Sequence, residues 1–373
     1  MKILIIPSWY PRSDNTSGSF FHDRAKALSK KGCDVTVAVA ELSFIKRGRS
    51  SAITSEYLDG VRIIRYFKRN ITPFSKSGIS VQKIGMIRSI YSQLVQENWK
   101  PDLIHLESAL DARAAVSLAK EESIALTYTE HSSKILASKK GDYYDKMMKQ
   151  AVNNADHIFV ISYAIKQRLE PPEGKWSMLP NETDFSKFTL ADQTMDFVFK
   201  TLGTLRKVKG YDILIRAFKM VKDRQYENCR LVIGGSGEEE HNLKQLAIDL
   251  NLESHVKFPG YIEASEKNNF FDNVSCFVCS SRIETFSIVT VEALACGIPV
   301  VATRCGGPED IVNDSNGYLV EKENALALAN GMIRMMYTRD CFDSQSIRSQ
   351  AKLLYDKDVV IDRQIEVFSH LVI

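Results

Sequence analysis

The sequence lacks the features that mark secreted and membrane-spanning proteins. No apolar run approaches the roughly 20 residues that cross a bilayer. The amino terminus, MKILIIPSWY, reaches a proline at position 7 and has neither the long apolar region nor the cleavage site of a signal peptide. We therefore expect a cytoplasmic protein, which could also lie peripherally on the inner face of a membrane.

Disulfide and metal frameworks are also missing. The seven cysteines are an odd number without regular spacing, which fits a reducing compartment. Cys276 and Cys279 form a CxxC pair inside an apolar stretch, with no second pair and no histidine cluster. Core packing is a better interpretation of this pair than a zinc or redox site, and we expect no metal.

The opening strand, 2–7, is not followed by the G-x-G-x-x-G pattern of dinucleotide-binding folds. A loop rich in serine, asparagine and glycine leads instead to a predicted helix over 20–30. Gly18 and Ser19 lie where this helix begins. A helix start of this kind offers backbone amides to an anion.

Acidic residues are scarce between residues 44 and 94, although the whole chain has a net charge of only +3. This segment has ten lysines and arginines against two acids, interleaved with aromatic and aliphatic residues. It suggests an anionic partner such as a lipid head group or a pyrophosphate. A solvated basic face is the alternative, and nucleic acid is not expected because no recognition motif accompanies the charge.

Strand-like and helix-like segments alternate along almost the whole chain, which predicts two α/β domains with doubly wound parallel sheets. The polar stretch 185–195 divides the two series. The expected organisation is an N-terminal Rossmann-like domain over 1–184, a linker over 185–195 and a C-terminal domain over 196–356. A final helix over 357–373 could pack back on the first domain.

Ser280–Ile311 is the stretch with the clearest chemistry. A buried strand over 276–279 leads into a loop with Glu284, and a predicted helix over 288–295 carries Glu292. Open parallel sheets bind ligands at the carboxyl ends of their strands. A carboxylate there can accept hydrogen bonds from two neighbouring hydroxyls, as on a ribose or a hexose.

Three other predicted strands of the second domain end in loops suited to phosphate or sugar. Gly203 is followed by Lys209 at the start of a helix, and two further strands end at Gly234–Gly237 and Gly260. Glycine permits close backbone approach, while a helix start with a lysine favours an anion. Cation, acid and free amides in one domain together describe a site for a nucleotide sugar.

These motifs resemble, in order, those of the retaining glycosyltransferases of family 4, which have the GT-B architecture of two Rossmann-like domains facing across a cleft. The resemblance rests on GTLRKVKG (203–210), LVIGGSG (231–237), VKFPG (256–260), SSRIETFSIVTVE (280–292) and ALACGIPVVAT (293–303). The first domain matches more loosely, through Gly18, PDLIH (101–105), His131 and the segment 155–162.

The resemblance implies a role for each site residue. Lys209 and Gly18 would hold the donor diphosphate, Glu292 the nucleotide ribose, and Glu284 the donor sugar. His131 would act near the reacting centre, so that His131, Glu284 and Lys209 form the catalytic set. The full donor-binding set is Gly18, Thr204, Arg206, Lys209, Gly235, Tyr261, Ile262, Glu284, Phe286, Ser287, Ile288 and Glu292.

Two positions depart from the family pattern. Thr204 stands where the family has an arginine for the diphosphate, and we expect Arg206 or Lys207 to supply the missing charge. Ser287 replaces a common glycine beside the donor sugar.

The expected activity is transfer of a hexose-type sugar, with retention, from a UDP- or GDP-linked donor to a glycan hydroxyl, without an obligatory metal. A lipid-linked precursor of a surface polysaccharide is the favoured acceptor. A sugar-nucleotide epimerase of the same architecture and a non-catalytic partner in glycan assembly are the alternatives.

Overall fold

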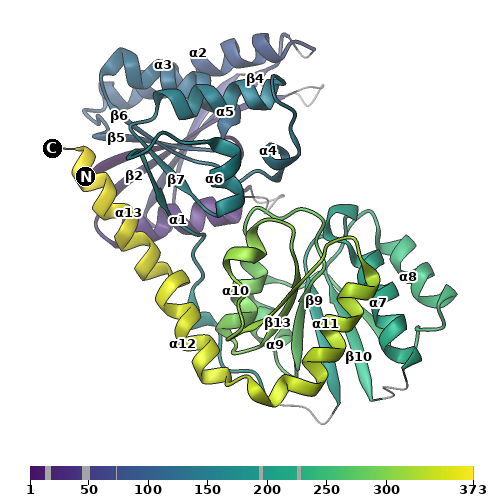
Figure 1. The fold of residues 1–373 in the computed structure, drawn as a ribbon. Coiled ribbons are helices and arrows are strands. Elements are labelled where there is room, and N and C mark those ends of the chain that lie inside the picture. Colours follow the sequence, from purple (N-terminus) through teal and green to yellow (C-terminus); the bar gives the residue numbers. More distant parts are fainter. Residues whose placement is uncertain (13–17, 44–50, 73, 193–195, 225–227, 373) are drawn as a thin grey trace. The chain divides into compact units, whose positions relative to one another are not determined.

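The chain is described from a computed structural model in residues 1–12, 18–43, 51–72, 74–192, 196–224 and 228–372. It divides into two compact units, Met1–Leu179 with Val360–Ile373, and Pro180–Val359. Each unit has one sheet with helices packed on its faces (Figure 1). The alternation of strands and helices therefore predicted the α/β class correctly.

The first unit has an eight-stranded sheet in the order β3-β4-β2-β1-β5-β6-β7-β8. All neighbouring strands pair in parallel except β3 and β4. The strands are β1 (Lys2–Pro7), β2 (Asp34–Ser43), β3 (Ala52–Leu58), β4 (Val61–Arg69), β5 (Leu103–Glu107), β6 (Ala125–Thr129), β7 (His157–Val160) and β8 (Trp176–Met178).

The antiparallel edge strand β3 is a feature that the sequence pattern did not lead us to expect. It pairs with β4 through a two-residue turn, Asp59–Gly60, in which both residues have positive φ (53° and 81°). This is the hairpin turn that Asp-Gly favours. The hairpin was missed because β3 is exposed along its length and has no apolar run.

The helices of the first unit include the last helix of the chain. They are α1 (Ser19–Lys30), α2 (Lys76–Gln96), α3 (Ala112–Glu122), α4 (Ser133–Ala137), α5 (Tyr143–Asn154), α6 (Tyr163–Leu169) and α13 (Lys357–Leu371). Val360, Ile361 and Phe368 of α13 are buried in the same core cluster as Ile3 of β1. Full burial of one such side chain contributes roughly 1.5–3 kcal/mol, which explains why the carboxyl-terminal helix belongs to the first unit.

The second unit has a six-stranded parallel sheet in the order β11-β10-β9-β12-β13-β14. Its strands are β9 (Phe197–Leu202), β10 (Cys229–Gly234), β11 (Val256–Gly260), β12 (Cys276–Cys279), β13 (Val300–Thr303) and β14 (Gly317–Val320). Its helices are α7 (Tyr211–Asp223), α8 (Glu240–Asp249), α9 (Lys267–Phe270), α10 (Ile288–Ala295), α11 (Ala325–Thr338) and α12 (Ser344–Tyr355).

The polar stretch 185–195 belongs to this second unit, so the interpretation of it as a linker is corrected as far as residues 185–192 are described. Phe185 and Phe188 are buried, and Phe188 packs edge-on against Phe271. The backbone amide of Thr189 donates to Asn268 at 2.8 Å. Two aromatic side chains thus attach a segment that looked unpatterned, and the second unit begins at Pro180, not at residue 196.

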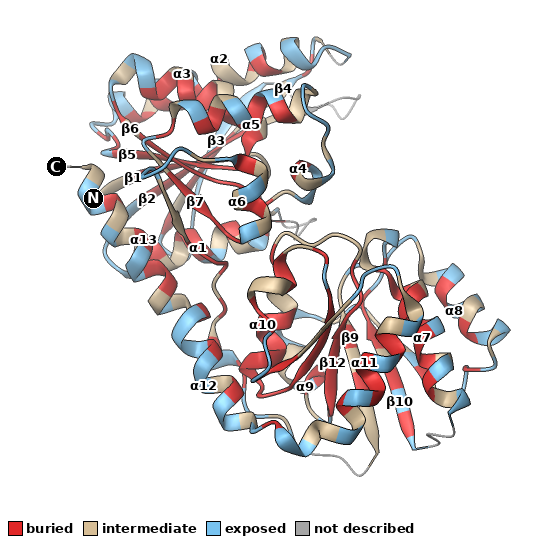
Figure 2. Cartoon of the chain, in the orientation of Figure 1, coloured by how far each residue is buried: buried red, intermediate tan, exposed pale blue. Residues whose placement is uncertain are grey.

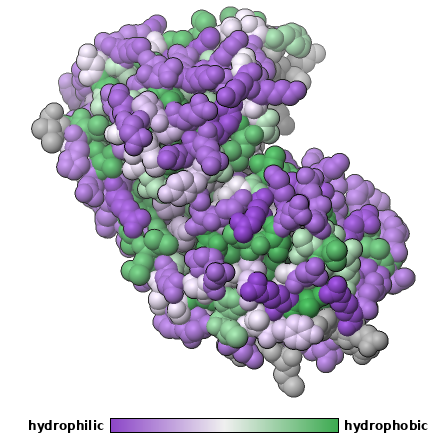
Figure 3. Space-filling model, in the orientation of Figure 1, coloured by the Kyte–Doolittle hydropathy of each residue, from purple (hydrophilic) through white to green (hydrophobic). Residues whose placement is uncertain are grey.

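Burial follows the layers of each unit. Figure 2 shows the strands largely buried and the outward faces of the helices exposed. Figure 3 shows hydrophilic side chains over much of the visible face, with smaller hydrophobic patches among them. No helix among the described residues is long and apolar enough to cross a membrane.

Candidate functional site

The predicted donor-binding residues of the second unit follow the carboxyl ends of neighbouring strands. Strands β10, β9, β12 and β13 are adjacent in the sheet and parallel, so the loops after them lie at one edge. Close contacts between these loops depend on glycine. A Cβ atom on Gly235 would lie 1.9 Å from the carbonyl oxygen of Gly203, and one on Gly307 would lie 2.3 Å from that of Phe286. The loops are therefore packed backbone to backbone.

Gly235 allows its loop to approach the backbone of Gly203 closely, but its amide is not free to bind a ligand. Its N–H donates to the carbonyl of Gly260 at 2.7 Å, and its φ of 127° suits glycine. Tyr261, just after Gly260, is more than half exposed and Ile262 is partly buried. These two residues lie at the end of β11, where they are accessible.

Lys209 and Glu284 form an ion pair. The Nζ atom of Lys209 lies 3.0 Å from Oε1 and 2.9 Å from Oε2 of Glu284. Burial would lower the pKa of Lys209, but the Glu284 carboxylate raises it above its ordinary value overall. Lys209 is consequently a permanent cation at neutral pH. The predicted diphosphate-binding and sugar-binding residues are thus brought together.

Arg282 braces this arrangement and was not singled out from the sequence. Its guanidinium makes a two-pronged ion pair with Asp212 of α7, at 2.9 and 2.8 Å, and a hydrogen bond to the carbonyl of Lys207. The amide of Arg282 also donates to the carbonyl of Val208. Arg282 therefore ties the acidic loop to the loop that carries Lys209.

Thr204, Arg206 and Lys207 are exposed on this same loop. Within the described part of the chain, neither the Arg206 nor the Lys207 side chain has an ion pair or a hydrogen bond. Both cations are consequently available to an anion. Whether either one binds the diphosphate stays a prediction.

The start of α10 offers backbone N–H groups. Among the described residues, no hydrogen bond engages the amides of Phe286, Ser287 or Ile288, as expected for the first residues of a helix. Ser287 has φ 90° and ψ 71°, a left-handed conformation that costs a non-glycine residue about 1–2 kcal/mol. Backbone strain of this kind is often found at binding sites.

Glu292 is buried in α10 and only partly paired. Its Oε1 atom lies 2.5 Å from Nζ of Lys267. Its Oε2 atom is buried and has no hydrogen bond from any described residue. Burial raises the pKa of Glu292 although Lys267 opposes this effect. A buried acceptor of this kind costs about 1–3 kcal/mol unless a ligand satisfies it, which suits a ribose hydroxyl.

Gly18 and His131 belong to the first unit. Gly18 precedes α1 with φ 88°, and a Cβ atom there would lie 2.8 Å from the Trp9 ring. His131 follows β6 and is buried against the rings of Phe20 and Phe21, whose centroids lie 5.1 and 5.2 Å away. Residues 13–17 lie outside the described residues.

Glu107 is a further site residue that sequence reasoning missed. It ends β5, is 1% exposed, and its Oε2 atom lies 2.7 Å from Nε2 of His131. An acidic residue at the end of a buried strand was a usable signal, because β5 and β6 are neighbours and their carboxyl ends meet. No such signal pointed to Lys267, which reaches Glu292 only through the fold.

Two family models divide the chain between them. The model described as Glycosyltransferase Family 4 matches residues 17–187, and the model described as Glycosyl transferases group 1 matches residues 182–352. Among curated proteins, the putative teichuronic acid biosynthesis glycosyltransferase TuaC of Bacillus subtilis is 26% identical over 90% of this chain and 89% of its own length. N-acetyl-alpha-D-glucosaminyl L-malate synthase of Bacillus anthracis is 22% identical over 90% of this chain and 88% of its own.

Solved structures share the fold. Sucrose-phosphate synthase from Thermosynechococcus elongatus superimposes with a TM-score of 0.79 at 19% identity, covering 99% of this chain and 98% of that one. HepE from Anabaena, solved in complex with UDP, has a TM-score of 0.74 at 18% identity and covers both chains fully. Together with the two family models, these likenesses place the chain among the GT-B glycosyltransferases of family 4, the group 1 type, and it belongs to that family.

Proposed function

We propose that this glycosyltransferase moves a hexose-type sugar, with retention of configuration, from a UDP- or GDP-linked donor to a glycan hydroxyl. The observation that carries the proposal is the cluster at one edge of the six-stranded sheet. There the cation Lys209 and the carboxylate Glu284 lie on neighbouring loops, and α10 contributes the carboxylate Glu292 and the unengaged amides at its start. A nucleotide-sugar donor consists of a diphosphate, a ribose and a sugar, and groups of these kinds are required to bind them.

The leaving group of such a transfer is a nucleoside diphosphate, on which negative charge develops. Preorganised cations and amide dipoles stabilise that charge. In our proposal Lys209 faces the diphosphate, aided by Arg206 or Lys207, and needs no metal. Glu292 binds the ribose, Glu284 binds the sugar, and His131 of the first unit takes part at the reacting centre.

A lipid-linked precursor of a surface polysaccharide is the proposed acceptor. Support comes from a relative of similar length, TuaC, whose name assigns it to teichuronic acid biosynthesis. The solved HepE complexes with UDP and UDP-glucose support a UDP-linked donor by likeness of fold.

A panel of nucleotide sugars tests the proposed donor. One UDP- or GDP-linked hexose should raise the unfolding temperature by roughly 5–10 °C, because ligand at 100 times its Kd stabilises by about 2.7 kcal/mol and each kcal/mol shifts Tm by about 2–4 °C. The same compound should release its nucleotide slowly without acceptor, in the presence of EDTA. The anomeric form of the sugar first released reports retention.

Three results would contradict this proposal. Isomerisation of the donor without nucleotide release would favour an epimerase. Binding without any turnover would favour a non-catalytic partner in glycan assembly. Turnover abolished by EDTA and restored by a divalent cation would overturn the metal-free part.

The basic segment 44–94 is partly neutralised by carboxylates outside it. Arg65 pairs with Glu41, Lys83 with Asp111, Arg62 with Glu97 and Arg88 with Glu121. Positions 46, 47 and 49 lie outside the described residues. The excess of charge counted along the sequence is therefore a poor guide to the surface.

Three cations of this segment, Lys68, Arg69 and Lys76, have no carboxylate partner among the described residues. They lie close in sequence to the exposed side chains of Ile71 and Phe74. We propose that these five side chains contact an anionic membrane surface. Each basic residue near such a surface contributes about 1 kcal/mol.

Replacing Lys68, Arg69 and Lys76 together by glutamine should weaken binding to phosphatidylglycerol-rich vesicles at least tenfold. Wild-type binding should also fall between about 0.1 M and about 1 M salt, since the Debye length shrinks from about 10 to about 3 Å. Vesicle co-sedimentation measures both. The matched control replaces Lys134, Lys139 and Lys140 of the same unit, and equal loss in the two triple variants would sink the assignment.

A further inference from the structure

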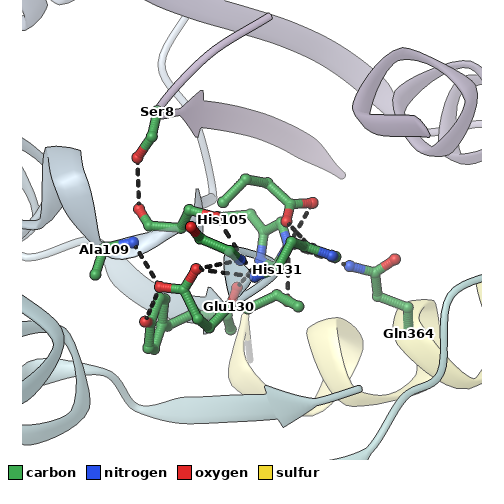
Figure 4. Close-up of polar contacts among 12 residues, drawn as sticks. Ser8, His105, Ala109, Glu130, His131 and Gln364 are labelled. Atoms are coloured by element: carbon green, nitrogen blue, oxygen red, sulfur yellow. Dashed lines mark hydrogen bonds and ion pairs between the residues drawn. The ribbon is translucent and has the colours of Figure 1, made fainter. Parts of the chain in front are cut away.

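The buried carboxylate of Glu130 binds main-chain amides of the loop that follows β6. Oε1 of Glu130 accepts hydrogen bonds from the amides of His131 and Ser132, at 3.0 and 2.7 Å. Its Oε2 atom accepts from the amide of Ala109 at 3.0 Å and from the hydroxyl of Tyr128 at 2.7 Å. Figure 4 shows Glu130 between Ala109 and His131. The backbone of His131 is thereby fixed.

A second carboxylate holds the ring of His131. Oε2 of Glu107 lies 2.7 Å from Nε2 of the imidazole. Phe20 and Phe21 pack against the same ring. Two aromatic rings and one carboxylate thus determine the plane of the His131 ring and its rotation within that plane.

The other oxygen of Glu107 is held in turn. Its Oε1 atom lies 3.1 Å from Nε2 of His105, a fully buried residue. His105 bonds through Nδ1 to Thr127 at 2.7 Å, and Gln364 of α13 reaches its Nε2 at 3.5 Å (Figure 4). Because both oxygens have partners, the Glu107 carboxylate cannot rotate freely.

An ionised carboxylate in this position lowers the stability of the fold. Desolvation costs several kcal/mol per buried ion, and a well-packed apolar group is often as stable. Burial would raise the pKa of Glu107, but His105 and His131 hold it well below its usual range. The charge is therefore retained at the carboxyl end of a central strand, where parallel sheets bind ligands.

We infer that Glu107 is a positioning residue for His131, which fixes the imidazole plane and keeps a proton on Nε2. This inference rests on the proposed function, in which His131 takes part in the reaction. A carboxylate bonded to one ring nitrogen determines which nitrogen carries the proton and how the ring is oriented. Glu107 needs no contact with the substrate for this role.

Glu107→Gln keeps the shape of the side chain and removes its charge. We expect kcat for nucleotide release to fall about 10–100-fold, the usual loss for an orienting partner, with the donor KM changed less than about threefold. In a His131→Ala background the same substitution should cost less than about twofold, because residues that act as a unit are not additive. Asp145→Asn is the matched control.

Asp145 is an equally buried carboxylate of the same unit, paired with Arg168 at 2.9 Å. Its substitution should lower stability and leave kcat unchanged. An unchanged kcat in Glu107→Gln, or a loss in Glu107→Gln that adds fully to that of His131→Ala, would overturn the inference.

A measurement independent of activity completes the test. With 15N-labelled histidine in the full chain, the His131 signals among the seven histidines are those lost in His131→Gln. We expect Nε2 to be protonated in the wild type and a population with unprotonated Nε2 to appear in Glu107→Gln. Unprotonated Nε2 in the wild type would refute the positioning role. If no nucleotide sugar is turned over, the proposed function fails, whereas this spectrum still decides the role of Glu107.

Discussion

Replacing Lys209 by methionine is expected to lower kcat/KM for nucleotide release about 100-fold or more. Removing one preorganised group that stabilises developing negative charge costs about 10²–10³ in rate, or about 2.7–4 kcal/mol. Methionine keeps the length of the side chain without its charge. Lys209 stays charged at neutral pH because Glu284 holds its pKa above the ordinary value.

Nucleotide release from the donor identified in the panel measures this effect. Lys219→Ala, which breaks an ion pair with Asp223 on the surface of α7, is the control and should retain full activity. In the same assay Arg206→Ala and Lys207→Ala test the substitute for the missing arginine, and at least one should weaken donor binding. Near-wild-type turnover in Lys209→Met would show that the Lys209 charge has no part in the reaction. Unchanged donor affinity in both Arg206→Ala and Lys207→Ala would show that neither residue replaces the arginine missing at Thr204.

Gly235→Ala should be the most destabilising of the single methyl additions considered for the second unit. Its Cβ would lie 1.9 Å from the carbonyl oxygen of Gly203, far inside van der Waals contact, and φ is 127°. Strained backbone positions cost about 1–3 kcal/mol each, and overpacking adds about 1–3 kcal/mol. We expect a loss of about 3 kcal/mol, a fall in Tm of roughly 10 °C, and no stabilisation by the donor.

Gly260→Ala is the matched control for this effect. Gly260, at the end of the next strand, also has a positive φ, 88°, but a Cβ atom added there would meet no other atom within 4 Å. Only the conformational cost of about 1 kcal/mol should remain. Thermal unfolding of the two variants side by side separates close approach from backbone strain. Equal losses of stability in the two variants would show that the close contact with Gly203 does not contribute to the effect of Gly235→Ala.

The order of strands and helices along the chain was enough to predict the layers of both units and the sheet edge at which the candidate site residues lie. Apolar strands such as 276–279 and 300–303 have the signature of buried parallel strands, and a helical segment separates them. The carboxyl ends of parallel strands share one edge, so Lys209 and Glu284 could be placed together although 75 residues separate them.

Exposed strands, and segments attached to the fold only by a few side chains, were harder to predict. The strand β3 has no buried face, so its only signal was the Asp59–Gly60 turn. The stretch 185–192 looked like a linker because its composition is polar, yet two buried phenylalanines anchor it to the second unit. The charge counted between residues 44 and 94 overstated the unpaired positive charge, since carboxylates from distant segments neutralise several of its arginines and lysines.

The sequence by itself determined the fold class, the family and the residue types that we propose bind a nucleotide sugar, because strand periodicity and loop motifs are local properties of the chain. Only the tertiary structure decided which side chains pair. It brought Lys267 to Glu292, Arg282 to Asp212, and Glu107 to both His105 and His131. Contacts across strands and between helices depend on register and packing at atomic distances, and no spacing along the chain encodes them. For that reason only the folded protein showed that Glu107 pairs with His131, although its place at the end of a buried strand was a signal in the sequence.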